Sequence, residues 1–61
     1  MSKTSERLVT VLAKLGETKK AALLNHEDLG EIDKKSLLIE LKWLTKEGFV
    51  SEFSNGILIL N

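Results

Sequence analysis

The first apolar positions of the chain recur with the period of an α-helix. One side of the predicted helix carries Leu8, Val11, Leu12 and Leu15, and the other carries Glu6, Arg7, Thr10 and Lys14. This spacing gathers the apolar side chains on one face of a helix. Ser2 or Thr4 can cap its start, and Gly16 is expected to end it. The chain therefore begins with one predicted amphipathic helix.

A second, shorter helix is predicted to follow, with Thr18 as its N-cap. The residues expected on its buried side are Ala21, Ala22 and Leu24, with Leu23 as a further candidate. The acidic run of residues 25–28 and the Leu29-Gly30 pair that follows are interpreted as the end of this helix and a turn.

The third predicted helix starts after Asp33, whose carboxylate can accept the amide protons of Lys35 or Ser36 as an N-cap. Its apolar stripe consists of Leu37, Leu41 and Leu44, and it is expected to end at Gly48. Both ends of this helix are thus marked in the sequence.

After Gly48 the helical period gives way to β-prone runs at residues 49–53 and 57–60. Ser54, Asn55 and Gly56 separate the two runs, and Asn-Gly favours a hairpin because both residues tolerate positive φ. The predicted fold is α+β and mostly α, with three helices followed by a C-terminal β-hairpin, in a single domain over residues 1–61.

The composition limits what such a domain can do. Nine Lys and Arg residues balance nine Asp and Glu residues, so the net charge is zero, whereas domains that hold polyanions usually carry an excess of base. No run approaches the roughly 18 apolar residues that span a bilayer, and the chain starts with a charged helix rather than a signal-peptide core. We therefore expect a soluble cytoplasmic protein without a membrane partner.

The stretch from Leu29 to Leu37, continuing through Leu41 and Leu44 to Gly48-Phe49-Val50, resembles the winged helix-turn-helix superfamily. In that superfamily a turn ending in Leu-Gly precedes a capped recognition helix, and a Gly-hydrophobic-hydrophobic step leads into the wing. The resemblance covers Leu8 to Leu60. It implies a three-helix bundle with a helix-turn-helix, closed by the C-terminal hairpin as a wing.

The resemblance also implies which residues would contact double-stranded DNA. Base contacts would come from the outward face of the third helix, at Lys34, Lys35, Ser36, Ile39 and Lys42, and phosphate contacts from Lys19, Lys20, Ser54 and Asn55. Two features oppose this. Four carboxylates, those of Glu27, Asp28, Glu31 and Asp33, crowd the start of the same helix, and the wing carries Glu52 but no Lys or Arg.

Apolar residues outside the predicted core point to a protein interface instead. Leu38, Ile39 and Trp43 fall outside the inner stripe of the third helix, and residues 57–60 are apolar on both faces of a strand. Either Leu38 and Trp43 cover the first helix or the hairpin, or a partner covers them. The last strand is likewise sandwiched against the helices, covered by a partner, or paired through its edge with a second copy. The candidate interface residues, with homodimerisation as the preferred account, are Leu38, Ile39, Trp43, Leu58 and Leu60.

The sequence shows no grouping typical of catalysis. His26 is the only histidine, and there is no cysteine, glycine-rich phosphate loop or paired-carboxylate cleft. We therefore expect no enzyme activity, no cofactor, no metal site and no small-molecule substrate. Two hypotheses remain: a dimeric DNA-binding, transcriptional-regulator-like protein, which we prefer, and a winged-helix module that binds proteins only.

Overall fold

The computed structural model describes residues 2–61, which form a small α+β fold that is mostly helical. Three α-helices and a three-stranded antiparallel sheet make up this part of the chain, together with one turn of 3-10 helix. In chain order, the elements are α1 (Lys3–Leu15), β1 (Thr18–Lys19), α2 (Lys20–Leu24), the 3-10 turn η1 (Glu27–Leu29), α3 (Lys34–Lys46), β2 (Val50–Glu52) and β3 (Ile57–Leu60).

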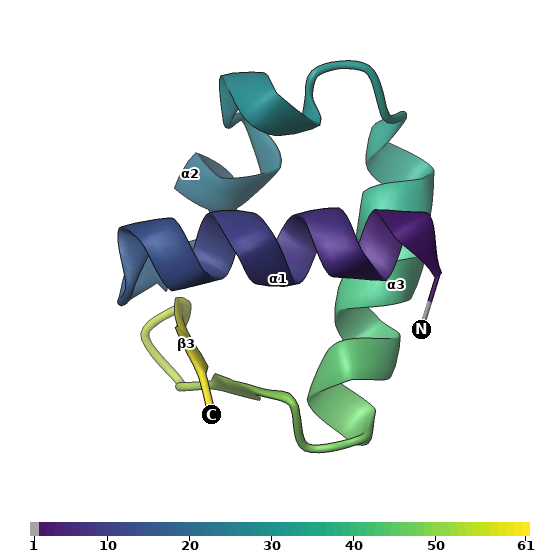
Figure 1. Ribbon diagram of the computed structural model, residues 1–61. Coiled ribbons are helices and arrows are strands. Elements are labelled where there is room, and N and C mark those ends of the chain that lie inside the picture. The colour runs from purple at the N-terminus through teal and green to yellow at the C-terminus, as the bar shows by residue number, and fades with distance from the viewer. Residues whose placement is uncertain (1) are drawn as a thin grey trace.

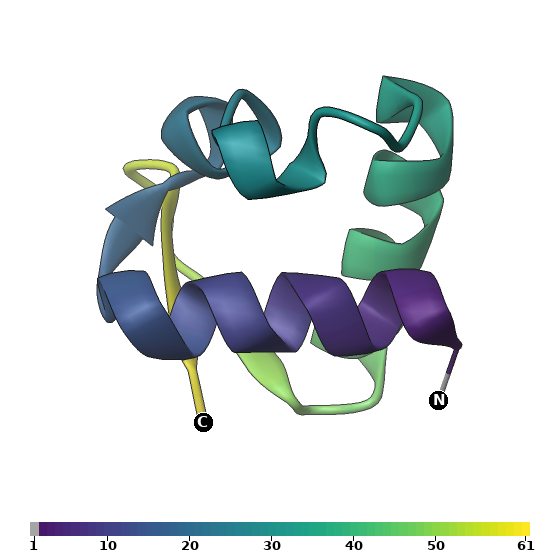
Figure 2. The same ribbon diagram turned by 45° about the horizontal axis from the view of Figure 1, so that its top comes forward.

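Helix α1 lies across one side of the domain and contacts α3, β3 and η1. In both views α3 stands against the N-terminal half of α1, the sheet lies at its C-terminal end, and α2 and η1 run along its length between them (Figures 1 and 2). This arrangement leaves one long side of α3 without a neighbouring element. None of the helices among the described residues is both long and apolar enough to cross a bilayer.

The predicted caps of the two long helices are confirmed. Of the two candidates for α1, Ser2 is the N-cap, and its side chain accepts the amide of Ser5 at 3.1 Å. Gly16 closes α1 at φ 70°, a region that glycine enters without a Cβ penalty. Asp33 caps α3 and accepts the amide proton of Ser36, rather than that of Lys35, at 3.2 Å.

Two predictions about the second helix are wrong. Thr18 does not cap it, because Thr18 lies in β1, opposite Leu58 of β3, and α2 starts after Lys19 without a side-chain cap. Ala21 and Ala22 are exposed, and the fully buried side chain is Leu23. A helix of five residues makes little more than one turn, so it turns few positions toward the core.

The sheet contains a strand that the sequence analysis did not predict. Strand β3 is central, with β1 and β2 on its two sides. In the registers, Thr18 lies opposite Leu58, and Val50 lies opposite Leu60. Strand β1 covers β3 at Ile57 and Leu58, so these two residues are not available for pairing with a second copy, whereas the register of β1 does not extend to Ile59 and Leu60.

The predicted hairpin joins β2 and β3, and Ser54, Asn55 and Gly56 form a three-residue loop between Phe53 and Ile57. Phe53 donates its amide proton to the Ile57 carbonyl at 2.9 Å, and Gly56 donates to the Phe53 carbonyl at 2.9 Å. Only Gly56 has a positive φ, 82°, while Asn55 does not. A tight turn followed by a left-handed glycine is a common three-residue hairpin.

A single apolar core joins the elements. Its fully buried members are Leu8, Val11, Leu12, Leu23, Leu29, Leu37, Leu41, Leu44, Val50 and Leu58. Leu15 was predicted on the inner stripe of α1, but it is exposed, because α1 extends past the core at its last turn. Leu58 was predicted at a protein interface. That is wrong, since Leu58 is enclosed by the domain itself.

Candidate functional site

The uncovered side of α3 is lined with lysines. Lys35, Ile39, Lys42 and Lys46 are spaced by four, three and four residues, which gathers them within an arc of about 60° on a helix. This arc lies opposite Leu37, Leu41 and Leu44, which are buried. All members of the arc are exposed, and so is Lys34 in the first turn. We call Lys34, Lys35, Lys42 and Lys46 the lysine face.

No carboxylate neutralises the lysine face within the part of the chain that the structure describes. None of its four lysines forms an ion pair with another residue in the range 2–61. The only carboxylate within α3 is Glu40, which points to α1 and accepts hydrogen bonds from the Ser2 and Ser5 hydroxyls at 2.9 and 3.1 Å. The outer side of α3 is therefore positively charged, although the whole chain is neutral.

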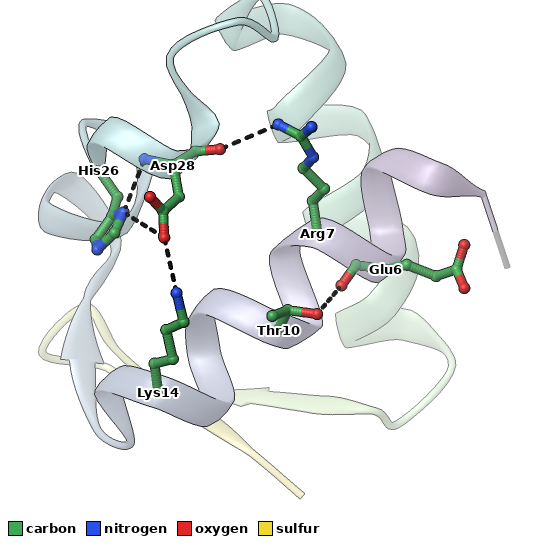
Figure 3. Close-up of polar contacts among 6 residues, drawn as sticks. All are labelled: Glu6, Arg7, Thr10, Lys14, His26 and Asp28. Carbon is green, nitrogen blue, oxygen red and sulfur yellow. Dashed lines mark hydrogen bonds and ion pairs between the residues drawn. The ribbon is translucent and has the colours of Figure 1, made fainter.

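The acidic run before α3 is engaged mainly with α1. The Asp28 carboxylate accepts a hydrogen bond from Lys14 Nζ at 3.1 Å, and His26 Nδ1 lies 3.9 Å from it (Figure 3). Arg7 donates to the Asp28 carbonyl oxygen at 3.3 Å, and its guanidinium is 3.7 Å from Glu31. The hydrogen bond and charge of Lys14 hold the pKa of Asp28 below its ordinary value.

Arg7, Asp28 and Glu31 help to line a hollow between α1 and η1 that carries charges of both signs. Its lining residues are Lys3, Glu6, Arg7, Thr10, Val11, Glu27, Asp28 and Glu31. Within residues 2–61, no group of three or more His, Asp and Glu side chains is arranged to hold a metal ion. The carboxylates of Glu27, Asp28 and Glu31, which were predicted to lie beside the lysines and oppose phosphate binding, thus lie next to α1.

Asp33 and Ser36, at the start of α3, are occupied with each other. The Ser36 hydroxyl donates to Asp33 Oδ1 at 2.7 Å, and its amide donates to Oδ2 at 3.2 Å. These hydrogen bonds lower the pKa of Asp33. Ser36 was predicted to contact bases, but its hydroxyl is already committed to the cap.

The other predicted phosphate contacts lie away from α3. Lys19 and Lys20 are next to the hairpin loop, where the Lys20 amide donates to the Gly56 carbonyl at 3.0 Å. Lys20 Nζ also lies 3.8 Å from the Glu52 carboxylate. The loop residues Ser54 and Asn55 are exposed, and Asn55 Oδ1 accepts the amide proton of Ile57.

The structure therefore separates the predicted nucleic-acid contacts into two groups. The hairpin group is at the C-terminal end of α1, and α3 is at its N-terminal end (Figure 1). Sequence reasoning missed Lys46, which joins the lysine face. Its spacing of four residues from Lys42 is the signal that could have identified it.

Three of the predicted interface residues are exposed on α3. The exposed fractions are 59% for Ile39, 44% for Leu38 and 39% for Trp43. The Trp43 ring stacks on Phe49, with ring centroids 5.8 Å apart, so Trp43 partly covers the start of the hairpin. Leu60 is half-buried and packs against the core.

The outer side of the sheet is also apolar. Because Val50, Leu58 and Leu60 face the core, strand alternation turns Phe49, Phe53, Ile57 and Ile59 outward. Phe49 is 43% exposed and Phe53 is 50% exposed, while Ile57 and Ile59 are half-buried. We call these four residues together with Trp43 the apolar surface.

No protein-family model matches the chain, and neither a curated protein nor a solved structure is similar enough to count as a match. Two features stand out, the lysine face and the apolar surface.

Proposed function

We propose that this domain is a non-enzymatic, DNA-binding domain of the winged helix-turn-helix type that acts as a transcriptional regulator, with α3 in the major groove of double-stranded DNA. The single observation that carries the proposal is the lysine face, which is exposed, positively charged and unpaired. The capped helix α3 and the hairpin that closes the core support the fold type.

The dimensions of α3 suit the groove. Its 13 residues span roughly 20 Å, and a helix with side chains is about 10–12 Å wide, close to the width of roughly 12 Å of the major groove. Lysines on the outer side of an inserted helix can reach the phosphates on both walls. The neutral total charge is compatible with this role, because Asp28, Glu31 and Glu40 all interact with residues of the N-terminal segment.

A salt titration tests this proposal. If each of the four lysines neutralises one phosphate, log K falls with log salt at a slope of about −3.6, and the affinity falls about 150-fold between 50 and 200 mM. The assay is fluorescence anisotropy with a labelled random-sequence duplex of 20 base pairs. The double variant Lys35→Gln/Lys42→Gln should flatten the slope by about 1.8.

The matched control is Lys3→Gln/Lys14→Gln, which removes the same charge from α1. It is expected to keep the wild-type slope. An absence of duplex binding at 50 mM salt would contradict the proposal, as would equal losses in the two double variants. Tighter binding to a single strand of the same length would exclude recognition of the major groove.

The apolar surface favours a second candidate function, a protein-binding module that dimerises. Trp43 and Phe49 stack on each other, and these two residues and Phe53 are 39–50% exposed. Exposed apolar surfaces of this kind often mark interfaces. Sedimentation equilibrium of the wild type beside Phe53→Ser tests self-association, with Leu38→Ser as a control outside the apolar surface. A wild type that stays monomeric at high concentration would remove dimerisation.

A further inference from the structure

Ile39 is an unusual apolar residue beside the lysine face, on the same outer side of α3. It is 59% exposed, more than any other large apolar side chain in residues 2–61. On the helix it lies among Lys35, Lys42 and Lys46, opposite the core. An isoleucine at such a position contributes little to folding, because most of its apolar area stays in water.

We propose that Ile39 contacts the C5 methyl group of thymine in the major groove. This inference rests on the proposed function, because it requires α3 to lie in that groove. Along the helix axis Ile39 lies between Lys35 and Lys42, so when these lysines reach out to phosphates its side chain approaches the edges of the bases. The thymine methyl group is the apolar feature displayed there.

The chemistry of the side chain selects this ligand. Isoleucine has no hydrogen-bond donor or acceptor, so it leaves the polar edges of guanine, cytosine and adenine without a partner. Ser36, the uncharged polar residue among the predicted base contacts, is bonded to Asp33. Burying one methyl group against Ile39 is expected to favour thymine about fourfold.

Replacing thymine by uracil isolates the methyl group. A pool of random-sequence 20-base-pair duplexes is prepared once with thymidine and once with deoxyuridine. The two pools keep the same charge and the same hydrogen-bonding edges, but only the first carries the methyl groups. Because the contacted position holds thymine in one quarter of random sequences, wild-type protein should bind the thymidine pool about 1.8-fold tighter at 50 mM salt.

The variant Ile39→Ala should bind both pools equally and keep the salt slope of the wild type. The matched control is Leu38→Ala, which shortens a 44% exposed side chain of α3 outside the arc. It should keep the preference for thymidine. Both changes are at the surface, so circular dichroism should show the same folded spectrum.

The possible results separate the two proposals. Salt-dependent binding without a preference for thymidine in the wild type would overturn the role of Ile39 and leave the DNA-binding function standing. A preference that survives in Ile39→Ala would also overturn it, because the methyl group would then be contacted elsewhere. No binding to either pool would overturn both proposals.

Discussion

Replacing Glu40 by alanine is expected to loosen the packing of α1 against α3. Glu40 Oε2 accepts a hydrogen bond from the Ser5 hydroxyl at 3.1 Å, and Oε1 accepts one from the Ser2 hydroxyl at 2.9 Å. Ser5 is fully buried, so it has no access to water. The Glu40→Ala change would remove the charged acceptor of the Ser5 hydroxyl and leave it beside the Ser2 hydroxyl, 3.2 Å away.

The loss in the free energy of unfolding can be estimated from the two hydrogen bonds that Glu40 accepts. A hydrogen bond to a charged group contributes about 1.5–3 kcal/mol, and a buried polar group left without a partner costs about 1–3 kcal/mol. Because the Ser2 bond is exposed, we expect a total loss of about 2–3 kcal/mol in the free energy of unfolding. A domain of 61 residues has about 3–9 kcal/mol in all. The melting temperature should therefore drop by about 10–20 °C.

A double-mutant cycle with Ser5→Ala identifies the origin of this loss. Removing Ser5 alone should cost about 1 kcal/mol, and the double variant should cost about 1–2 kcal/mol less than the sum of the single changes. Urea denaturation followed by the fluorescence of Trp43, the single tryptophan, supplies the free energies.

The control for this cycle is Glu47→Ala, which removes an exposed carboxylate at the C-cap of α3 and should change stability by less than about 0.5 kcal/mol. A Glu40→Ala variant as stable as this control would refute the reasoning. A coupling energy of zero with Ser5 would refute it equally.

Three further predictions concern the apolar core, the glycine of the hairpin loop and the loss of stability at acidic pH. Leu58→Ala should cost about 2–5 kcal/mol in urea denaturation, whereas Leu38→Ala should cost less than about 0.5 kcal/mol; equal costs would contradict the burial pattern. Gly56→Ala places a Cβ at φ 82° and should cost about 1–2 kcal/mol in thermal unfolding. Lys14 lowers the pKa of Asp28, so their pair stabilises the fold above pH 3.8 and is lost as the pH falls further. Lys14→Gln should therefore flatten the loss of stability measured between pH 5 and 2.

The two long helices could be predicted because each carries its own boundaries. Helices α1 and α3 span 13 residues each, with a buried stripe, a capping side chain and a glycine at or just beyond the end. The hairpin was predictable for a related reason, since Gly56 supplies the left-handed residue that its loop needs. In these segments local chemistry and tertiary packing favour the same structure.

The remaining elements depend on contacts that are distant in sequence. Strand β1 has only two residues, and Thr18 and Lys19 are extended because β3 pairs with them. Residues 57–60 are apolar on both faces, so their pattern could not tell which face is inside. The pairing with β1 and β2 decides this, and it places Leu58 in the core.

The charge distribution could not be obtained from the sequence either. Asp28 and Glu31 lie close to Lys34 along the chain, yet in the structure they interact with Lys14 and Arg7 of α1. The number of charged residues and their order in the chain do not show which of them share a side of the folded domain. Because α1 supplies Arg7 and Lys14, Glu31 and Asp28 pair with α1 rather than with the lysine face.

The same contacts thus hold the domain together and shape its charged surface. Glu40 binds two serines at the start of α1, and this both anchors α3 and keeps a carboxylate off its outer side. Loss of Glu40 would raise the net charge by one and at the same time weaken the support of the lysine face. If DNA binding depends on how rigidly α3 is held, Glu40→Ala should weaken binding despite the added positive charge. If it depends on charge alone, the same variant should bind more tightly.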